Sequence, residues 1–152
     1  MTTTIHRATV DDLDALVPLF DSYRQFYAQP SDPGAAYAFL SARMHRDESM
    51  VLLARVETGA VVGFTQLYPT FSSVRTARVW VLNDLYVDTA ARGCGAARAL
   101  LQAAAQFARD DGAIRLELET TPDNTHAQAL YHATGWQLYD DTLRFHLPLT
   151  RG

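Results

Sequence analysis

The sequence predicts an α/β fold with a mixed sheet, built as one domain over residues 1–152. β-rich and helical runs alternate in the order βααββ and then βαβαββ, which is typical of a mixed sheet with helices on its faces. The composition, 48% hydrophobic and 20% charged, is that of an ordinary globular protein. A chain of 152 residues can bury a substantial core, and no repeat, low-complexity run or long linker divides it.

The chain opens with signals for a strand and a helix. Residues 4–9 are strand-like, and Thr9 is a candidate N-cap with Asp11 and Asp12 in the first turn of the helix that follows. Apolar residues then recur at helical spacing as far as Tyr27. Pro18 lies inside this helix, so we expect a kink there.

A second helix and a hairpin are expected next. Asp32 is a candidate N-cap and Pro33 a candidate first helical residue, which predicts a helix that runs to about Arg46. The β-rich runs at residues 49–56 and 61–68 are joined by a short turn that contains glycine. This pattern predicts a β-hairpin.

The second half of the chain alternates between strands and helices. The predicted elements are a strand at residues 77–87, a helix at 95–109 ended by Gly112, a strand at 113–120, a short helix at 124–134 closed by Gly135, and two final strands at 136–140 and 143–149. Together with the first half this gives about seven strands and four helices.

Charge and hydropathy exclude several classes of partner. The formal net charge is −4, from 13 Lys and Arg against 17 Asp and Glu, so we expect neither nucleic acid nor an anionic membrane as a partner. No run approaches the ~20 apolar residues that a membrane-spanning helix needs, and the first residues do not resemble a signal peptide. We therefore expect a cytoplasmic protein.

The sequence gives no metal-binding pattern. Its one cysteine, Cys94, excludes an internal disulfide and any cysteine-based zinc cluster. The five histidines show no pair at metal-ligand spacing with a supporting cysteine. We expect no metal.

A glycine-containing turn joins the strand at residues 77–87 to the next helix. A helix start presents unpaired N–H groups and the positive end of the helix dipole, and small residues let an anion approach them. Small residues and two cations surround this start: Arg92, Gly93, Cys94, Gly95, Ala96, Ala97 and Arg98. The turn is either a phosphate or pyrophosphate site or a tight turn that needs glycine for its dihedral angles. It is neither the dinucleotide-binding G-x-G-x-x-G fingerprint nor a P-loop, so a nucleotide-binding protein is the weaker alternative.

Two segments of the chain have the spacing of known motifs. The first motif has Gln or Arg, then Gly three residues on, then Gly or Ala two further on; Arg92, Gly95 and Ala97 fill these positions. The second is "NTHAQALYHATGW", with Asn124, Ala127, Leu130, Tyr131, Gly135 and Trp136 at its fixed places. By these two motifs the chain resembles the GNAT superfamily of N-acetyltransferases, in which the first motif is the pyrophosphate loop, and the resemblance covers essentially the whole chain. It implies a central twisted mixed sheet whose fourth and fifth strands splay apart to admit acetyl-CoA.

The resemblance also implies where acetyl-CoA binds. Backbone groups of Leu85, Tyr86 and Val87 would pair with the acetyl and pantetheine part, and residues 92–98 would hold the pyrophosphate. Asn124 would lie near the pantetheine arm. Cys94 occupies a position that the family motif leaves free, so it is either a tolerated small residue or, near a helix start, a reactive thiol.

Tyr131 matches the family tyrosine that commonly protonates the departing CoA thiolate. A phenol suits this task because its ordinary pKa of ~10 keeps it protonated at neutral pH. The alternative is a packing role beside Leu130 on the short helix.

Two carboxylates are candidates for the base that deprotonates the amine. Glu119 lies twelve residues before Tyr131, an interval that resembles the glutamate and tyrosine pair of ribosomal-protein N-terminal acetyltransferases. The other candidate comes from "LNDLYV", which resembles a segment of the diamine and polyamine acetyltransferases in which Asn83 replaces a glutamate. An amide cannot take a proton, so Asn83 could only orient a water or the amine, and Asp84 would carry the charge. Either carboxylate could equally be an ordinary surface group.

The resemblance implies transfer of acetyl from acetyl-CoA to a primary amine by direct attack in a ternary complex. The diamine-like segment and the acidic charge favour a small cationic amine, a polyamine or an amino acid side chain, and a protein lysine or N-terminus stays open. Aromatic residues near the C-terminus could cover a homodimer interface or pack in the domain's own core. The rival hypothesis is a non-catalytic acyl-CoA sensor, which Asn83 favours.

Overall fold

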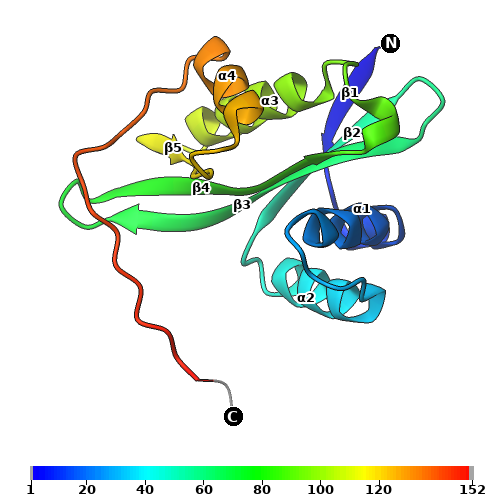
Figure 1. The fold of residues 1–152 in the computed structure, drawn as a ribbon, viewed down its shortest axis with the longest axis horizontal. Helices are drawn as coiled ribbons and strands as arrows, with labels where there is room; N and C mark the ends of the chain where they lie inside the picture. Colours follow the sequence, from blue (N-terminus) through cyan, green and yellow to red (C-terminus); the bar gives the residue numbers. More distant parts are fainter. Residues whose placement is uncertain (1, 151–152) are drawn as a thin grey trace. The chain divides into compact units, whose positions relative to one another are not determined.

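A five-stranded mixed sheet forms the centre of the first of two units in the chain (Figure 1). The computed structural model describes residues 2–150, divided into Met1–Glu119 and Thr120–Gly152. The strands are β1 (Thr3–Arg7), β2 (Met50–Val56), β3 (Val61–Ser72), β4 (Ala77–Val87) and β5 (Arg115–Glu117), in that spatial order. The first four pair antiparallel and β5 pairs parallel with β4. The predicted mixed α/β fold is confirmed.

The helices of the first unit lie on both faces of this sheet (Figure 1). They are η1 (Val10–Asp12), α1 (Leu13–Phe26) and α2 (Pro33–His45) on one side, with η2 (Thr89–Ala91) and α3 (Ala96–Asp110) after β4. Phe64 of β3 and Leu16, Phe20 and Leu40 of α1 and α2 form the core on the first side. Leu100 and Ala104 are buried on α3, which packs on the other side.

Local capping explains where the first helices begin. Thr9 and Asp12 form a capping box, in which the Asp12 carboxylate accepts from the Thr9 N–H at 2.8 Å. The Asp32 carboxylate caps α2 by accepting from the Ala35 N–H at 3.0 Å. Both N-caps were predicted from the sequence. α1 continues through Pro18, and the kink expected there stays a prediction.

A β-bulge in β4 decides which face of the sheet Asp84 reaches. Gln66 of β3 lies opposite Asp84, whereas the next residue, Leu67, lies opposite Leu82, so Asn83 is an extra residue. Because side chains alternate between faces, one extra residue turns those that follow it to the opposite face. Trp80, before the bulge, contacts Phe107 of α3, whereas Asp84, after it, contacts α1.

The fifth strand is shorter than predicted. The alternating pattern of residues 113–120 predicted a strand throughout, but β5 pairs with β4 only over Arg115–Glu117. A strand lasts only as long as a neighbour accepts its backbone hydrogen bonds. Glu119 consequently lies beyond the end of β5 and not along it.

The second unit contains α4 (Thr125–Ala133), capped by Asn124 and followed by Gly135 at φ +97°. The two final strands predicted at 136–140 and 143–149 are wrong: no strand is described among residues 120–150. Leu143, Phe145 and their neighbours have strand-like composition, but within this unit no partner strand pairs with them. The structure therefore has five described strands and not about seven.

Candidate active site

β4 continues beyond its pairing with β5. The last paired residues are Val81 and Glu117, while β4 runs on to Val87. This is the geometry expected where two parallel strands splay apart. Among the described residues of the first unit, no strand pairs with this side of β4 from residue 82 onward. Such an edge offers backbone N–H and C=O groups to an extended ligand.

Asp84 is the buried acid at this edge, with 2% of its surface exposed. Its Oδ2 accepts a hydrogen bond from Nε2 of Gln66 at 2.7 Å. Its Oδ1 accepts from Nδ2 of Asn83 at 2.8 Å and from the hydroxyl of Tyr23 at 3.3 Å. The Thr65 hydroxyl holds the Asp84 backbone carbonyl at 2.7 Å. Both carboxylate oxygens are thus bonded to named donors on three elements.

Burial dominates the electrostatics of this site. It raises the pKa of Asp84, although the hydrogen bonds from Asn83, Gln66 and Tyr23 act in the opposite direction. Burial, followed by the nearby charge of Asp84, raises the pKa of Tyr23. Burial and the same carboxylate raise the pKa of Tyr68, which lies on β3. Asp84 is therefore a stronger proton acceptor than an exposed carboxylate, and both phenols stay protonated.

Aromatic rings surround the hydroxyl that reaches Asp84. The Tyr23 ring lies 5.2 Å from that of Tyr27, 5.7 Å from that of Phe64 and 6.4 Å from that of Tyr86. The Tyr27 ring in turn lies 5.2 Å from that of Phe26, and both of these residues are more than half exposed. A series of rings thus leads from the surface at the end of α1 to the buried carboxylate.

Sequence reasoning missed two members of this site, Tyr23 and Gln66. Tyr23 belongs to the residues at helical spacing that predicted α1, and no functional role was predicted for it. Gln66 was counted within a β-rich hairpin strand, although it lies two residues from both Phe64 and Tyr68 and so shares their face. A glutamine on an otherwise aromatic strand face was the one signal that could have found it.

The glycine turn before α3 has the backbone geometry predicted for it. Gly93 and Gly95 have φ of +86° and +83°, and Gly95 is the N-cap of α3 without a side-chain hydrogen bond to the helix. A Cβ at either position would meet no atom within 4 Å, so backbone conformation and not crowding requires glycine. The first-turn N–H groups of α3 lack partners within the helix, as in any α-helix. The turn is therefore compatible with both interpretations, a tight turn that needs glycine and a phosphate or pyrophosphate site.

The cations of this turn differ in what they contact. Nε of Arg92 donates to the carbonyl of Val87 at 3.3 Å, and its guanidinium lies 5.9 Å from the ring centre of Tyr86. Arg98 is exposed in the first turn of α3. Arg92 thus links the turn to the end of β4.

The remaining candidates lie at or beyond the end of the first unit. Glu119 is exposed. In the second unit the Asn124 side chain accepts from the Ala127 N–H at 3.3 Å and so caps α4. Tyr131 lies on α4 with its ring 6.1 Å from that of Trp136. Asn124 therefore has a structural task whether or not it also contacts a ligand.

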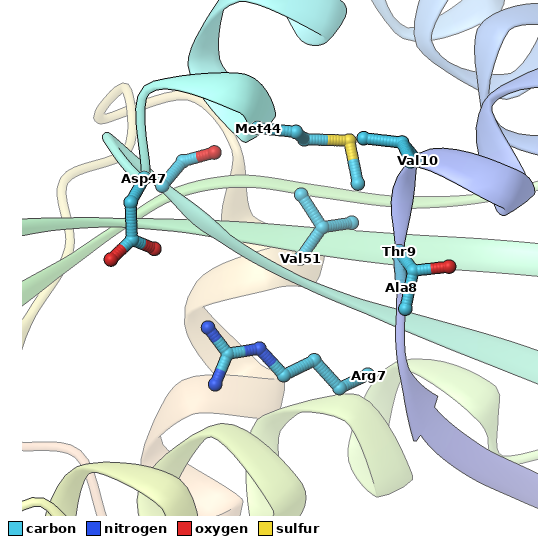
Figure 2. A pocket seen from close by; sticks show the side chains of 8 residues that line it. Arg7, Ala8, Thr9, Val10, Met44, Asp47 and Val51 are labelled. Atoms are coloured by element: carbon cyan, nitrogen blue, oxygen red, sulfur yellow. The ribbon is translucent and has the colours of Figure 1, made fainter.

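A separate shallow pocket lies near the end of β1 (Figure 2). Met44, Val10 and Val51 converge on its apolar side, with Arg7 and Asp47 nearby. Its volume of about 90 Å³ is well below the ~300 Å³ or more of typical ligand pockets, and none of its lining residues was a candidate.

No helix within residues 2–150 is long and apolar enough to cross a membrane. Across the same residues, no group of three or more His, Cys, Asp or Glu side chains could hold a metal ion.

Comparison with known proteins identifies the family. The model of the acetyltransferase (GNAT) family matches residues 15–136, most of the chain. The chain belongs to the GNAT family of acetyltransferases. It is therefore an N-acetyltransferase, and this family generally uses acetyl-CoA.

Relatives of this acetyltransferase align with it over most of its length. The uncharacterized N-acetyltransferase YhfO of Bacillus subtilis is 47% identical over 133 residues, 88% of this chain and 89% of the relative. A protein named as a probable acetyltransferase from Haemophilus influenzae is 31% identical over 139 residues, 91% and 93% of the two chains. A crystal structure, also of a probable acetyltransferase, has a TM-score of 0.92 at 41% identity and covers 98% of this chain and 99% of its own.

Proposed function

We propose that this acetyltransferase moves the acetyl group of acetyl-CoA to the primary amine of a small cationic molecule, by direct attack in a ternary complex. The observation that carries the proposal is the buried carboxylate of Asp84 on β4, beside the edge where β5 has separated. An ammonium group must lose a proton before it can attack a thioester. A carboxylate with a raised pKa, held by three donors, is suited to accept that proton.

The same edge fits acetyl-CoA. Residues 85–87 of β4 offer backbone groups to the pantetheine amides, as the strand edge of a peptide-binding protein does. The start of α3, with residues 92–98, offers N–H groups, positive helix dipole and two arginines to the pyrophosphate. Asn124 completes the proposed set near the pantetheine arm.

Protonation of the departing thiolate falls to Tyr131 in this proposal. Asn83, exposed at the bulge, orients the amine or a water. Glu119 is the competing base, but it is exposed, whereas Asp84 is buried and its pKa is raised by that burial. We therefore assign the proton acceptor to Asp84.

Two features favour a small cationic amine, such as a polyamine. Aromatic rings attract ammonium groups, and Phe26, Tyr27 and Tyr23 lead toward Asp84. The net charge of −4 adds a weak general attraction for cations. A peptide lysine would satisfy the same chemistry, so peptides belong in the test.

One observation favours a second function, a non-catalytic acyl-CoA sensor. Asn83 stands where the diamine acetyltransferases that the segment resembles have a glutamate, and an amide takes no proton. A sensor would bind acetyl-CoA and leave it intact with every amine.

The test measures free CoA thiol released from acetyl-CoA with polyamines, lysine analogues, aminoglycosides and lysine peptides. We expect amine-dependent release that falls about tenfold or more in Tyr131→Phe, which corresponds to about 1.4 kcal/mol of transition-state stabilisation. Tyr139→Phe is the matched control, because Tyr139 is 72% exposed in the same unit. Binding of acetyl-CoA without release in the presence of any amine would contradict the transferase proposal and support the sensor.

A further inference from the structure

The hydroxyl of Tyr23 lies between the protein surface and the buried acid. It is 3.3 Å from Oδ1 of Asp84 and 3.3 Å from the backbone carbonyl of Asn83. Tyr23 is half-buried, whereas Asp84 is 2% exposed. Asn83, the bulge residue, comes two residues after Val81, the last residue of β4 that pairs with β5. The hydroxyl is thus beside the edge proposed to hold the acetyl group.

Asp84 is 2% exposed, so an amine at the surface has no direct route to its carboxylate. The Oδ2 atom accepts a hydrogen bond from Gln66, and Oδ1 accepts hydrogen bonds from Asn83 and Tyr23. The amide N–H groups of Gln66 and Asn83 donate hydrogen bonds to the carboxylate but cannot transfer a proton to it. A hydroxyl both donates and accepts, so of these three donors only Tyr23 can take a proton on one side while giving one on the other.

We propose that Tyr23 relays the proton of the substrate amine to Asp84. This inference rests on the proposed function. The N–H bond of the ammonium breaks and its proton joins Oη of Tyr23, while the original Oη–H proton moves to Oδ1 of Asp84. The electron pair left on nitrogen attacks the thioester carbon and opens its C=O bond to an oxyanion, and the C–S bond breaks when the carbonyl re-forms. The thiolate leaves with the proton of Tyr131, and the second proton that nitrogen loses restores Tyr131. Tyr23 ends as it began, and Asp84 becomes a neutral carboxyl. No oxidant, reductant or added co-reactant is required.

The protonation tendencies of the site agree with a relay. The raised pKa of Tyr23 keeps it a phenol, so it passes a proton without storing charge as tyrosinate. The titratable groups that act on Tyr23 through charge are Asp84, then Tyr27 on α1 and Tyr68 on β3, and all three raise its pKa. Arg43 acts on Tyr68, where it slightly offsets the rise in the phenol pKa.

Gln66 can serve both protonation states of Asp84. Its Nε2 donates to the carboxylate, and within the described residues its buried Oε1 has no donor at hydrogen-bond distance. A half-turn of the amide would present Oε1 to a protonated Asp84 in place of Nε2. A glutamine thus suits an acid that gains and loses a proton in each cycle.

The first test compares Tyr23→Phe with Tyr37→Phe, a tyrosine on α2 that is 49% exposed. Phenylalanine keeps the ring that packs on Phe64 and Tyr86 and removes only the hydroxyl. We expect kcat to fall about tenfold or more in Tyr23→Phe, with KM for acetyl-CoA within about twofold of wild type. The acid limb of its kcat profile should move to higher pH, because Asp84 has lost one donor to its charged form. Tyr37→Phe removes a hydroxyl outside the proposed site and should keep both kcat and the profile.

Unchanged kcat and pH profile in folded Tyr23→Phe would overturn the relay and leave the transferase proposal intact. Absence of amine-dependent release by the wild-type protein would overturn the proposed function itself. A second measurement needs no variant: the single-turnover rate in mixtures of H₂O and D₂O. A relay moves two protons in one step and predicts a curved dependence on deuterium fraction, and a straight line would overturn it.

Discussion

At the scale of single residues, Asp84 combines burial with three hydrogen-bond donors. Its folded pKa is raised, so the neutral form is favoured in the folded protein relative to the unfolded chain. The resulting contribution to stability is present below the unfolded pKa of about 4 and is lost as pH rises through the folded value. Ionisation of this buried group therefore costs stability as pH rises.

Asp84→Asn should remove this pH dependence. An asparagine cannot ionise, so the free energy of unfolding of the variant, relative to wild type, should increase as pH rises from about 4 to 7. Urea unfolding at the two pH values measures the difference. A stability difference that is the same at both would show that Asp84 does not titrate with a raised pKa. Glu48→Gln is the control, because the Glu48 side chain is exposed in a surface ion pair with Arg43.

The roles of single residues could be predicted from the sequence where their contacts are local. Thr9 and Asp32 act on N–H groups within three residues, so their capping roles followed from the sequence. Tyr23 and Gln66 act on a carboxylate 61 and 18 residues away. Their roles depend on a bulge, and a bulge leaves no mark on the hydrophobic pattern when its extra residue is polar and exposed.

At the scale of elements, the turn before α3 and the edge of β4 are built from backbone groups. Gly95 must adopt φ of +83°, and the helix that follows has no side-chain cap. The glycine therefore fixes where the N–H groups of the first turn lie. Its conformation matters to both stability and the proposed pyrophosphate site.

Gly95→Ala should destabilise the protein by about 1–2 kcal/mol, the cost of a left-handed conformation for an L-residue. The cost is conformational, since a Cβ there meets nothing within 4 Å. It should also weaken acetyl-CoA binding, measured by calorimetry. Gly34→Ala in the first turn of α2 is the control, because its Cβ would make an ordinary contact at 3.6 Å and alanine favours helix. Equal stability of the two variants would contradict this account of the turn.

The limits of prediction differ between elements. α2, β4 and α3 were predicted nearly to their ends, because caps and composition define them locally. The extent of β5 and the two final strands could not be predicted, since a strand needs a partner and the alternating pattern does not say how far pairing extends. The shortness of β5 is also what frees the edge of β4.

At the scale of the whole molecule, element order and two motifs carried the family assignment, and the match over residues 15–136 confirmed it. The identity of the amine substrate was harder to predict from the sequence, because side chains from α1 and β3 surround the acid on β4. The polyamine preference, the possible homodimer and the cytoplasmic location stay predictions.

The two candidate bases are distinguished by kcat for the preferred amine in Asp84→Asn and Glu119→Gln, measured at saturating acetyl-CoA. We expect a loss of about 100-fold or more in Asp84→Asn, with acetyl-CoA affinity kept, and a change within about threefold in Glu119→Gln. The reverse pattern, a large loss only in Glu119→Gln, would contradict the assignment of the proton acceptor to Asp84.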